Sequence, residues 1–224
     1  MLLAVWAFLL HGCASMSENE CRATDWWIVG QKDGSEGKLF SALAEHQEAC
    51  AEHGVTPDRH AYAEGHRSGL LVYCTRFNGY RVGRTDARYH GVCTGPLAEA
   101  FESGLGTGRL VRTREMEVWD IKRERKKLRE HIGRLENETK TLQEKLEAKE
   151  SVPEDREDMR KKVKKINQEI EGLRLEYEDS AKKQADAQAR FDEAVEQARS
   201  EGYADDGGLL RAYQKLRALG DALD

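Results

Sequence analysis

The sequence predicts an all-α protein. A small disulfide-stapled helical bundle comes first, then a long antiparallel coiled-coil hairpin and a short C-terminal helix. Four cysteines lie together in the first half of the chain, among glycines and aromatic residues that recur at helical spacing. In the second half, apolar residues alternate in steps of three and four, the pattern of a coiled-coil seam. Strand signals are sparse, so an α/β fold has little support.

The first element is an apolar run over residues 2–10, about half the roughly 20 residues that a membrane-spanning helix needs. Its length is that of a signal peptide, which we expect over residues 1–12. The run lacks a preceding Lys or Arg, which a start codon further upstream would explain. The alternative is a buried apolar N-terminus with a chance cysteine.

The sequence Leu10-His11-Gly12-Cys13 follows and resembles the bacterial lipobox. This resemblance implies that Cys13 is acylated, with palmitate-type chains, and becomes the first mature residue. Several acyl chains together anchor a protein stably. The polar residues 13–20 then form a lipidated tether. By resemblance to enterobacterial sorting signals, Ala14 implies an outer-membrane lipoprotein that faces the periplasm and contacts the membrane through its lipid.

The cysteines left after Cys13 number four, an even set that predicts two disulfides in an exported chain. Three connectivities are open. We favour Cys21–Cys50 with Cys74–Cys93. Cys50 and Cys74 would lie near opposite ends of an antiparallel helix pair joined around Gly54, too far apart to bond.

Histidines near these cysteines offer an alternative, a metal site. His46, Cys50 and His53 fall at helical spacing, and His60 and His66 follow. Such a set binds metal in a reducing compartment. Behind an export signal oxidised sulfur is favoured, so we expect no metal.

A short pattern recurs in the first half: an aromatic residue, a glycine three positions later, and a small residue four positions after that. At 3.6 residues per turn each copy lies along one helical stripe. Glycine inside a helix is costly, so its recurrence predicts close packing of helices. The alternative is a ligand groove lined by the four aromatic residues. The copies are Trp27-x-x-Gly30-x-x-x-Gly34, Tyr62-x-x-Gly65-x-x-x-Gly69, Tyr80-x-x-Gly83-x-x-x-Ala87 and Phe101-x-x-Gly104-x-x-x-Gly108.

Helix and turn signals divide the first half into four or five short helices. Apolar residues from Leu39 to Cys50 follow helical spacing, and Pro57-Asp58 is typical of a helix start. Asn78-Gly79 and the residues 94–96 are turn signals. Residues 21–112 therefore form the predicted helical domain.

This segment resembles a known family of bacterial lipoproteins, grouped as domain of unknown function 2799. The resemblance covers residues 13–112 and implies an envelope location and an expected fold. It implies no activity and no catalytic residue. It rests on Cys21-x5-Trp27-x2-Gly30-x2-Asp33-Gly34, His46-x3-Cys50, Gly54-Val55-x-Pro57-Asp58, Tyr62-x2-Gly65-x3-Gly69-Leu70-x2-Tyr73-Cys74-Thr75 and Asn78-Gly79-Tyr80-x2-Gly83-x5-Tyr89-x-Gly91-Val92-Cys93.

The second half predicts a hairpin over residues 113–201, with a break at residues 151–155 where Pro153 suits a new helix start. Arg125 and Thr139 interrupt the first seam. The second arm, about 45 residues, would reach roughly 65–70 Å. Residues 202–224 predict an amphipathic C-terminal helix that carries Leu209, Leu210, Tyr213, Leu216 and Leu219. The seams are Val118, Ile121, Arg125, Leu128, Ile132, Leu135, Thr139, Leu142, Leu146, and Met159, Val163, Ile166, Ile170, Leu173, Tyr177, Ser180, Gln184, Ala187, Phe191, Ala194, Ala198.

Composition and motifs exclude several function classes. The net charge of -5 argues against nonspecific phosphate binding, so we expect no nucleic-acid partner. The basic stretches 122–129 and 160–165 are interleaved with acids, as on solvated helix faces, although acidic polymers or lipid headgroups are an alternative. Common catalytic motifs are missing, so we expect no enzyme, catalytic residue or cofactor. The acid–base candidates do not converge in the sequence; they are Asp33, His66, Asp86 and His90.

The favoured function is therefore a structural or protein-interaction role. The hairpin would reach an envelope protein partner, and its seam also allows a homo-oligomer. The alternative is a binding module for a small ligand or a cell-wall fragment. That module would use the aromatic–glycine domain, with Trp27, Tyr62, Tyr80 and Phe101 as the binding residues.

Overall fold

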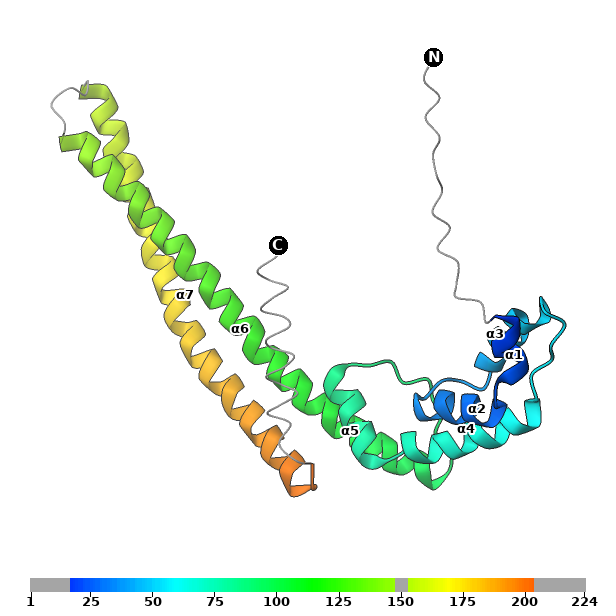
Figure 1. Cartoon of the computed structure of the whole chain (residues 1–224). Helices are drawn as coiled ribbons and strands as arrows, with labels where there is room; N and C mark the ends of the chain where they lie inside the picture. The colour runs from blue at the N-terminus through cyan, green and yellow to red at the C-terminus, as the bar shows by residue number, and fades with distance from the viewer. Residues whose placement is uncertain (1–16, 148–152, 204–224) are drawn as a thin grey trace, which may run out of the picture. The chain divides into compact units, whose positions relative to one another are not determined.

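A computed structural model describes residues 17–147 and 153–203 (Figure 1). Within these residues it contains seven helices and no strand, which confirms the predicted all-α fold. The signal peptide, Cys13, and the apolar residues of the predicted C-terminal helix lie outside the described residues. No helix in the described ranges is long and apolar enough to span a bilayer.

The chain divides into two compact units between Gly106 and Thr107. This division lies inside helix α6 (Pro96–Glu147), which runs without a break. The predicted domain boundary at residue 112 therefore falls within a continuous helix. Periodicity alone places such a boundary poorly, because both sides of it are helical.

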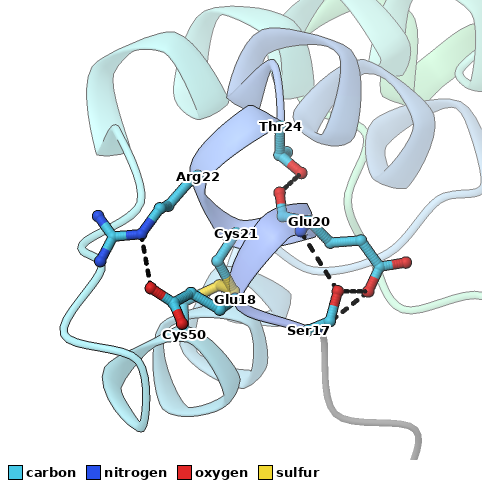
Figure 2. Close-up of a disulfide and its surroundings, with 7 residues drawn as sticks. All are labelled: Ser17, Glu18, Glu20, Cys21, Arg22, Thr24 and Cys50. Carbon is cyan, nitrogen blue, oxygen red and sulfur yellow. Dashed lines mark hydrogen bonds and ion pairs between the residues drawn. A yellow bond between two sulfur atoms is a disulfide. The ribbon is translucent and has the colours of Figure 1, made fainter.

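Helix α1 (Glu18–Ala23) starts within the segment predicted as a tether. Ser17 and Glu20 form a capping box, in which the Ser17 hydroxyl accepts from the Glu20 amide and the Glu20 carboxylate accepts from the Ser17 amide (Figure 2). Helix α2 (Trp26–Ser35) follows, with Asp25 as its cap. The S-x-x-E signature of the capping box was present in the sequence.

Helices α3 (Ala42–Ala51) and α4 (Arg59–Tyr73) correspond to the helical segments that the sequence predicts. Asp58 caps α4 by accepting from the amides of His60 and Ala61, so the predicted helix start is confirmed.

Helix α5 (Arg76–Thr85) corrects one prediction, because Asn78 and Gly79 lie inside it and not in a turn. The Asn78 amide group donates to the Tyr73 carbonyl oxygen, so its hydrogen bonds support the helix start. The helix ends at Asp86, whose φ of 58° is left-handed. Ala87 lies beyond this end, so the third predicted copy of the aromatic–glycine pattern is not wholly helical.

Both disulfides have the pairing that we favoured. Cys21 bonds to Cys50 and Cys74 bonds to Cys93, each with 5.6 Å between the Cα atoms. All four cysteines are buried. The prediction of a disulfide-stapled domain is therefore confirmed.

The glycines of α2 and α4 let the two helix backbones touch. A Cβ atom on Gly30 would lie 2.1 Å from the Tyr62 carbonyl oxygen, and one on Gly65 would lie 1.9 Å from that of Trp27. Gly34 and Gly69 meet the partner helix one turn later in the same way. Gly30 meets Tyr62 and Gly34 meets His66, so residue numbers rise in the same direction along both helices and the helices run parallel. Only glycine permits this approach, which confirms the predicted close packing.

The helix pair formed by α5 and the start of α6 repeats this contact. A Cβ atom on Gly79 would lie 2.0 Å from the Phe101 carbonyl oxygen, and one on Gly104 would lie 2.0 Å from that of Arg76. The contact register therefore starts at Arg76 and Gly79, one turn before the predicted Tyr80 and Gly83. In each pair a disulfide joins the segment before the first helix to the segment before the second.

Helices α6 and α7 (Pro153–Ser200) lie side by side as the predicted antiparallel hairpin (Figure 1). The 48 residues of α7 extend about 72 Å. The seam buries small and branched side chains, and Arg125 interrupts it as predicted. Its guanidinium carbon lies 4.6 Å from the Tyr177 ring centroid, and it donates to the Gln184 amide oxygen at 2.6 Å. A polar seam group of this kind fixes the register of the two helices.

Candidate functional site

The most notable polar group of the first unit is the carboxylate of Asp33, which is only 2% exposed. Its Oδ1 atom accepts from Lys38 Nζ at 2.8 Å. Its Oδ2 atom accepts from the Tyr62 hydroxyl at 2.8 Å and from His46 Nε2 at 2.9 Å. These four residues, together with His66, are called the Asp33 cluster below.

Different elements supply the members of the Asp33 cluster. Asp33 lies near the end of α2, and Lys38 lies in the connection that follows. His46 comes from the middle of α3, and Tyr62 and His66 come from α4. His66 Nε2 donates to the Lys38 carbonyl oxygen at 2.9 Å, so Lys38 is held by its side chain and by its backbone.

Hydrogen bonds keep the cluster charged. Burial alone would raise the pKa of Asp33, but the bonds from Lys38, His46 and Tyr62 hold that pKa below its ordinary value. The bond to Asp33 raises the pKa of Lys38. Burial, followed by the bond to Asp33, raises the pKa of Tyr62 well above its ordinary value. A carboxylate, an ammonium and a neutral phenol are therefore the stable forms at neutral pH.

Aromatic rings enclose the Asp33 cluster. The Tyr62 ring stacks on His66 with centroids 5.9 Å apart, and Phe40 meets both rings edge-on. Trp26 lies 6.0 Å from His46. The His46 side chain is 25% exposed, and through it and Lys38 the cluster reaches solvent.

The four aromatic residues predicted as binding residues differ in their exposure. Tyr62, Tyr80 and Phe101 are buried, and Tyr62 and Phe101 belong to separate core clusters. Trp27 is 40% exposed. The burial of Tyr62, Tyr80 and Phe101 favours the packing interpretation of the aromatic–glycine pattern.

The predicted acid–base candidates separate into two groups. Asp33 and His66 come together on Lys38. Asp86 ends α5, and His90 lies in the connection before Cys93. Sequence reasoning missed Lys38 as the shared partner of Asp33 and His66. The available signal was the position of Asp33 between two helix-packing glycines, which turns its carboxylate toward a neighbouring helix.

The alternative metal set does not assemble in the disulfide-bonded protein. Cys50 is bonded to Cys21, and the Nε2 atom of His46 is engaged by Asp33. Among residues 17–147 and 153–203, no three His, Cys, Asp or Glu side chains are grouped so as to hold a metal ion.

Comparison with known proteins finds a match for only part of the chain. No curated protein and no solved structure matches the chain. A family model described as "Protein of unknown function (DUF2799)" matches residues 25–110, the part that contains both glycine-crossed helix pairs. The resemblance of the sequence to domain of unknown function 2799 is thereby confirmed over residues 25–110.

Proposed function

We propose that this protein is an envelope lipoprotein that presents its coiled-coil hairpin to a protein partner. The observation that carries the proposal is the hairpin itself, formed by α7, of 48 residues, and the part of the 52-residue α6 that follows its contact with α5. A long arm of this kind extends far beyond what a small stapled domain needs for its own core. Long helical faces are common surfaces for protein recognition.

The proposed location is the outer membrane, with the protein facing the periplasm. Cys13 of the lipobox-like sequence stands four residues before Ser17, where the described chain begins. The two buried disulfides support an oxidising compartment. Acyl chains on Cys13 would hold the stapled domain at the membrane, and the hairpin would serve as the contact arm.

Charges along the hairpin support interaction over catalysis. Arg174 pairs with Glu136 across the two helices at 2.5 Å, and Lys162 pairs with Glu138 at 2.7 Å. These exposed pairs add little stability, but they leave a patterned polar surface that a partner can read. Ion pairs of the same kind would also allow a second copy of the hairpin to associate.

Shortening the hairpin tests this proposal. Replacing residues 132–174 with a Gly/Ser loop keeps the base of both arms, including the contact between Arg125 and Gln184. We expect the shortened protein to lose its crosslinked partner in whole cells. A matched full-length variant, Glu18→Gln, should keep it because the exposed ion pair of Glu18 with Arg22 lies outside the hairpin.

The readout is the set of crosslinked adducts, compared after intact mass has shown both disulfides in each protein. Recovery of the same partner with the shortened hairpin would refute the interaction role. The binding-module alternative would then gain support, with the stapled domain as the binding part.

A further inference from the structure

The two helix pairs of the stapled domain can be compared position by position, because their glycine contacts are equivalent. Asp33 lies three residues after Gly30, as Val82 does after Gly79. In the second helices, Tyr62 and His66 hold the same positions around Gly65 that Phe101 and Leu105 hold around Gly104. All six side chains are buried.

The second pair therefore makes the same crossing with an apolar core. Val82, Phe101 and Leu105 belong to one hydrophobic cluster, whereas Asp33, Tyr62 and His66 form the polar cluster of the first pair. Burying polar groups costs free energy, and apolar replacements of similar volume are often neutral or stabilising. The polar set is consequently not a requirement of the helix crossing.

The connections within the two pairs also differ. The second pair is joined by the short segment 86–95, which contains no helix. The first pair is joined by residues 36–58, which contain α3. Three hydrogen bonds of the Asp33 cluster tie the helix pair to this longer connection. Asp33 accepts from the Lys38 side chain and from His46, and His66 donates to the Lys38 carbonyl oxygen. Only Leu43 and Cys50 of α3 are buried.

We propose that the Asp33 cluster is an acid-releasable latch, which holds the connection 36–58 with α3 on the α2–α4 pair. The helix pair itself stays assembled when the latch opens, because its glycine contacts do not involve these polar groups. The disulfide between Cys21 and Cys50 keeps the end of α3 attached, so release concerns residues 36–49.

The charges around Asp33 set the direction of the pH response. Lys38, His46 and Tyr62 bond to Asp33 directly. In the shell around them Glu36 pairs with Lys38, the charge of Glu45 acts on Tyr62, and His66 bonds to the Lys38 carbonyl oxygen. The pKa of Asp33 is lowered in the folded protein. The latch therefore contributes its full stability above the ordinary carboxyl pKa, near 3.9. That contribution is lost as the pH falls through the lowered pKa.

Opening the latch would uncover aromatic surface. Trp26 and Phe40 pack on His46, Tyr62 and His66. Acid release of α3 would thus expose an aromatic face on the membrane-side domain, without unfolding the helix pair. In the proposed envelope setting, the latch would respond to external acidity.

Backbone amide exchange of the full-length, disulfide-bonded protein tests the latch, with rates corrected for intrinsic pH effects. The triple variant Asp33→Val, Tyr62→Phe, His66→Leu copies the second pair into the first. At pH 7 we expect about tenfold or faster exchange in residues 36–49, while α2 and α4 stay protected. The wild type should show the same local opening in acid. Lys38→Met removes one of the three bonds to the connection and should raise exchange in residues 36–49 by a smaller factor.

Two results would overturn the proposal. Loss of protection in α2 and α4 together with α3 would make the cluster part of the helix crossing. Unchanged protection of residues 36–49 in both variants, and in the wild type in acid, would show that other contacts hold α3. Asp120→Asn, on the exposed face of α6, is the control and should leave exchange in residues 36–49 unchanged.

Discussion

Replacing Gly65 by alanine is expected to destabilise the stapled domain by about 3 kcal/mol, although alanine is the better helix former. A Cβ atom at Gly65 would lie 1.9 Å from the Trp27 carbonyl oxygen and 2.7 Å from its carbon. Both atoms are backbone, so the contact is relieved only by separating α2 from α4. Separation would also remove the matching contacts of Gly30, Gly34 and Gly69.

Denaturant unfolding followed by tryptophan fluorescence measures this effect, since Trp26 of α2 is buried in one core cluster with Tyr62 of α4. Gly106→Ala is the matched control, because a Cβ atom there meets nothing within 4 Å. We expect the control to be neutral or up to about 1 kcal/mol more stable. Equal effects of the two substitutions would contradict the close helix crossing.

Removing the first disulfide with Cys21→Ala and Cys50→Ala is expected to cost about 3–4 kcal/mol. The bond closes a loop with a sequence separation of 29 residues, and both sulfurs are buried. It also holds α1, because Cys21 is the only buried residue of that helix. The other bonds of α1 in Figure 2, such as Arg22 to Glu18, are local and exposed.

Thermal unfolding and amide exchange of the double variant check this expectation. The midpoint should fall, and the α1 amides should lose protection even where α2 stays folded. Glu18→Gln removes the exposed ion pair with Arg22 and should change neither quantity measurably. An unchanged midpoint with a protected α1 would show that the helix is held by something other than the disulfide.

Much of this fold was predictable because local signals agreed with tertiary contacts. The disulfide pairing followed from the reach of a helix between Cys50 and Cys74. The hairpin followed from uninterrupted steps of three and four, and Asp58 marked the start of α4. In each case one residue type at one spacing allows few alternatives.

The remaining details depended on contacts between distant segments. Asn78-Gly79 has the form of a turn, yet Gly79 is needed where α5 meets the carbonyl oxygen of Phe101. The partners of Asp33 come from positions 5, 13 and 29 residues further along the chain. No local pattern joins such residues. The apolar equivalents in the second pair become visible only after the glycine contacts set the register.

Intact mass of the protein purified from membranes, beside a Cys13→Ser version, tests the account of an exported, stapled lipoprotein most directly. We expect a mature mass that starts at Cys13, carries acyl chains, and lacks four hydrogens for the disulfides Cys21–Cys50 and Cys74–Cys93. The Cys13→Ser version should lack the acyl chains. An unprocessed, unacylated chain with free thiols would contradict the envelope location and would return the His46–Cys50–His53 metal set to consideration.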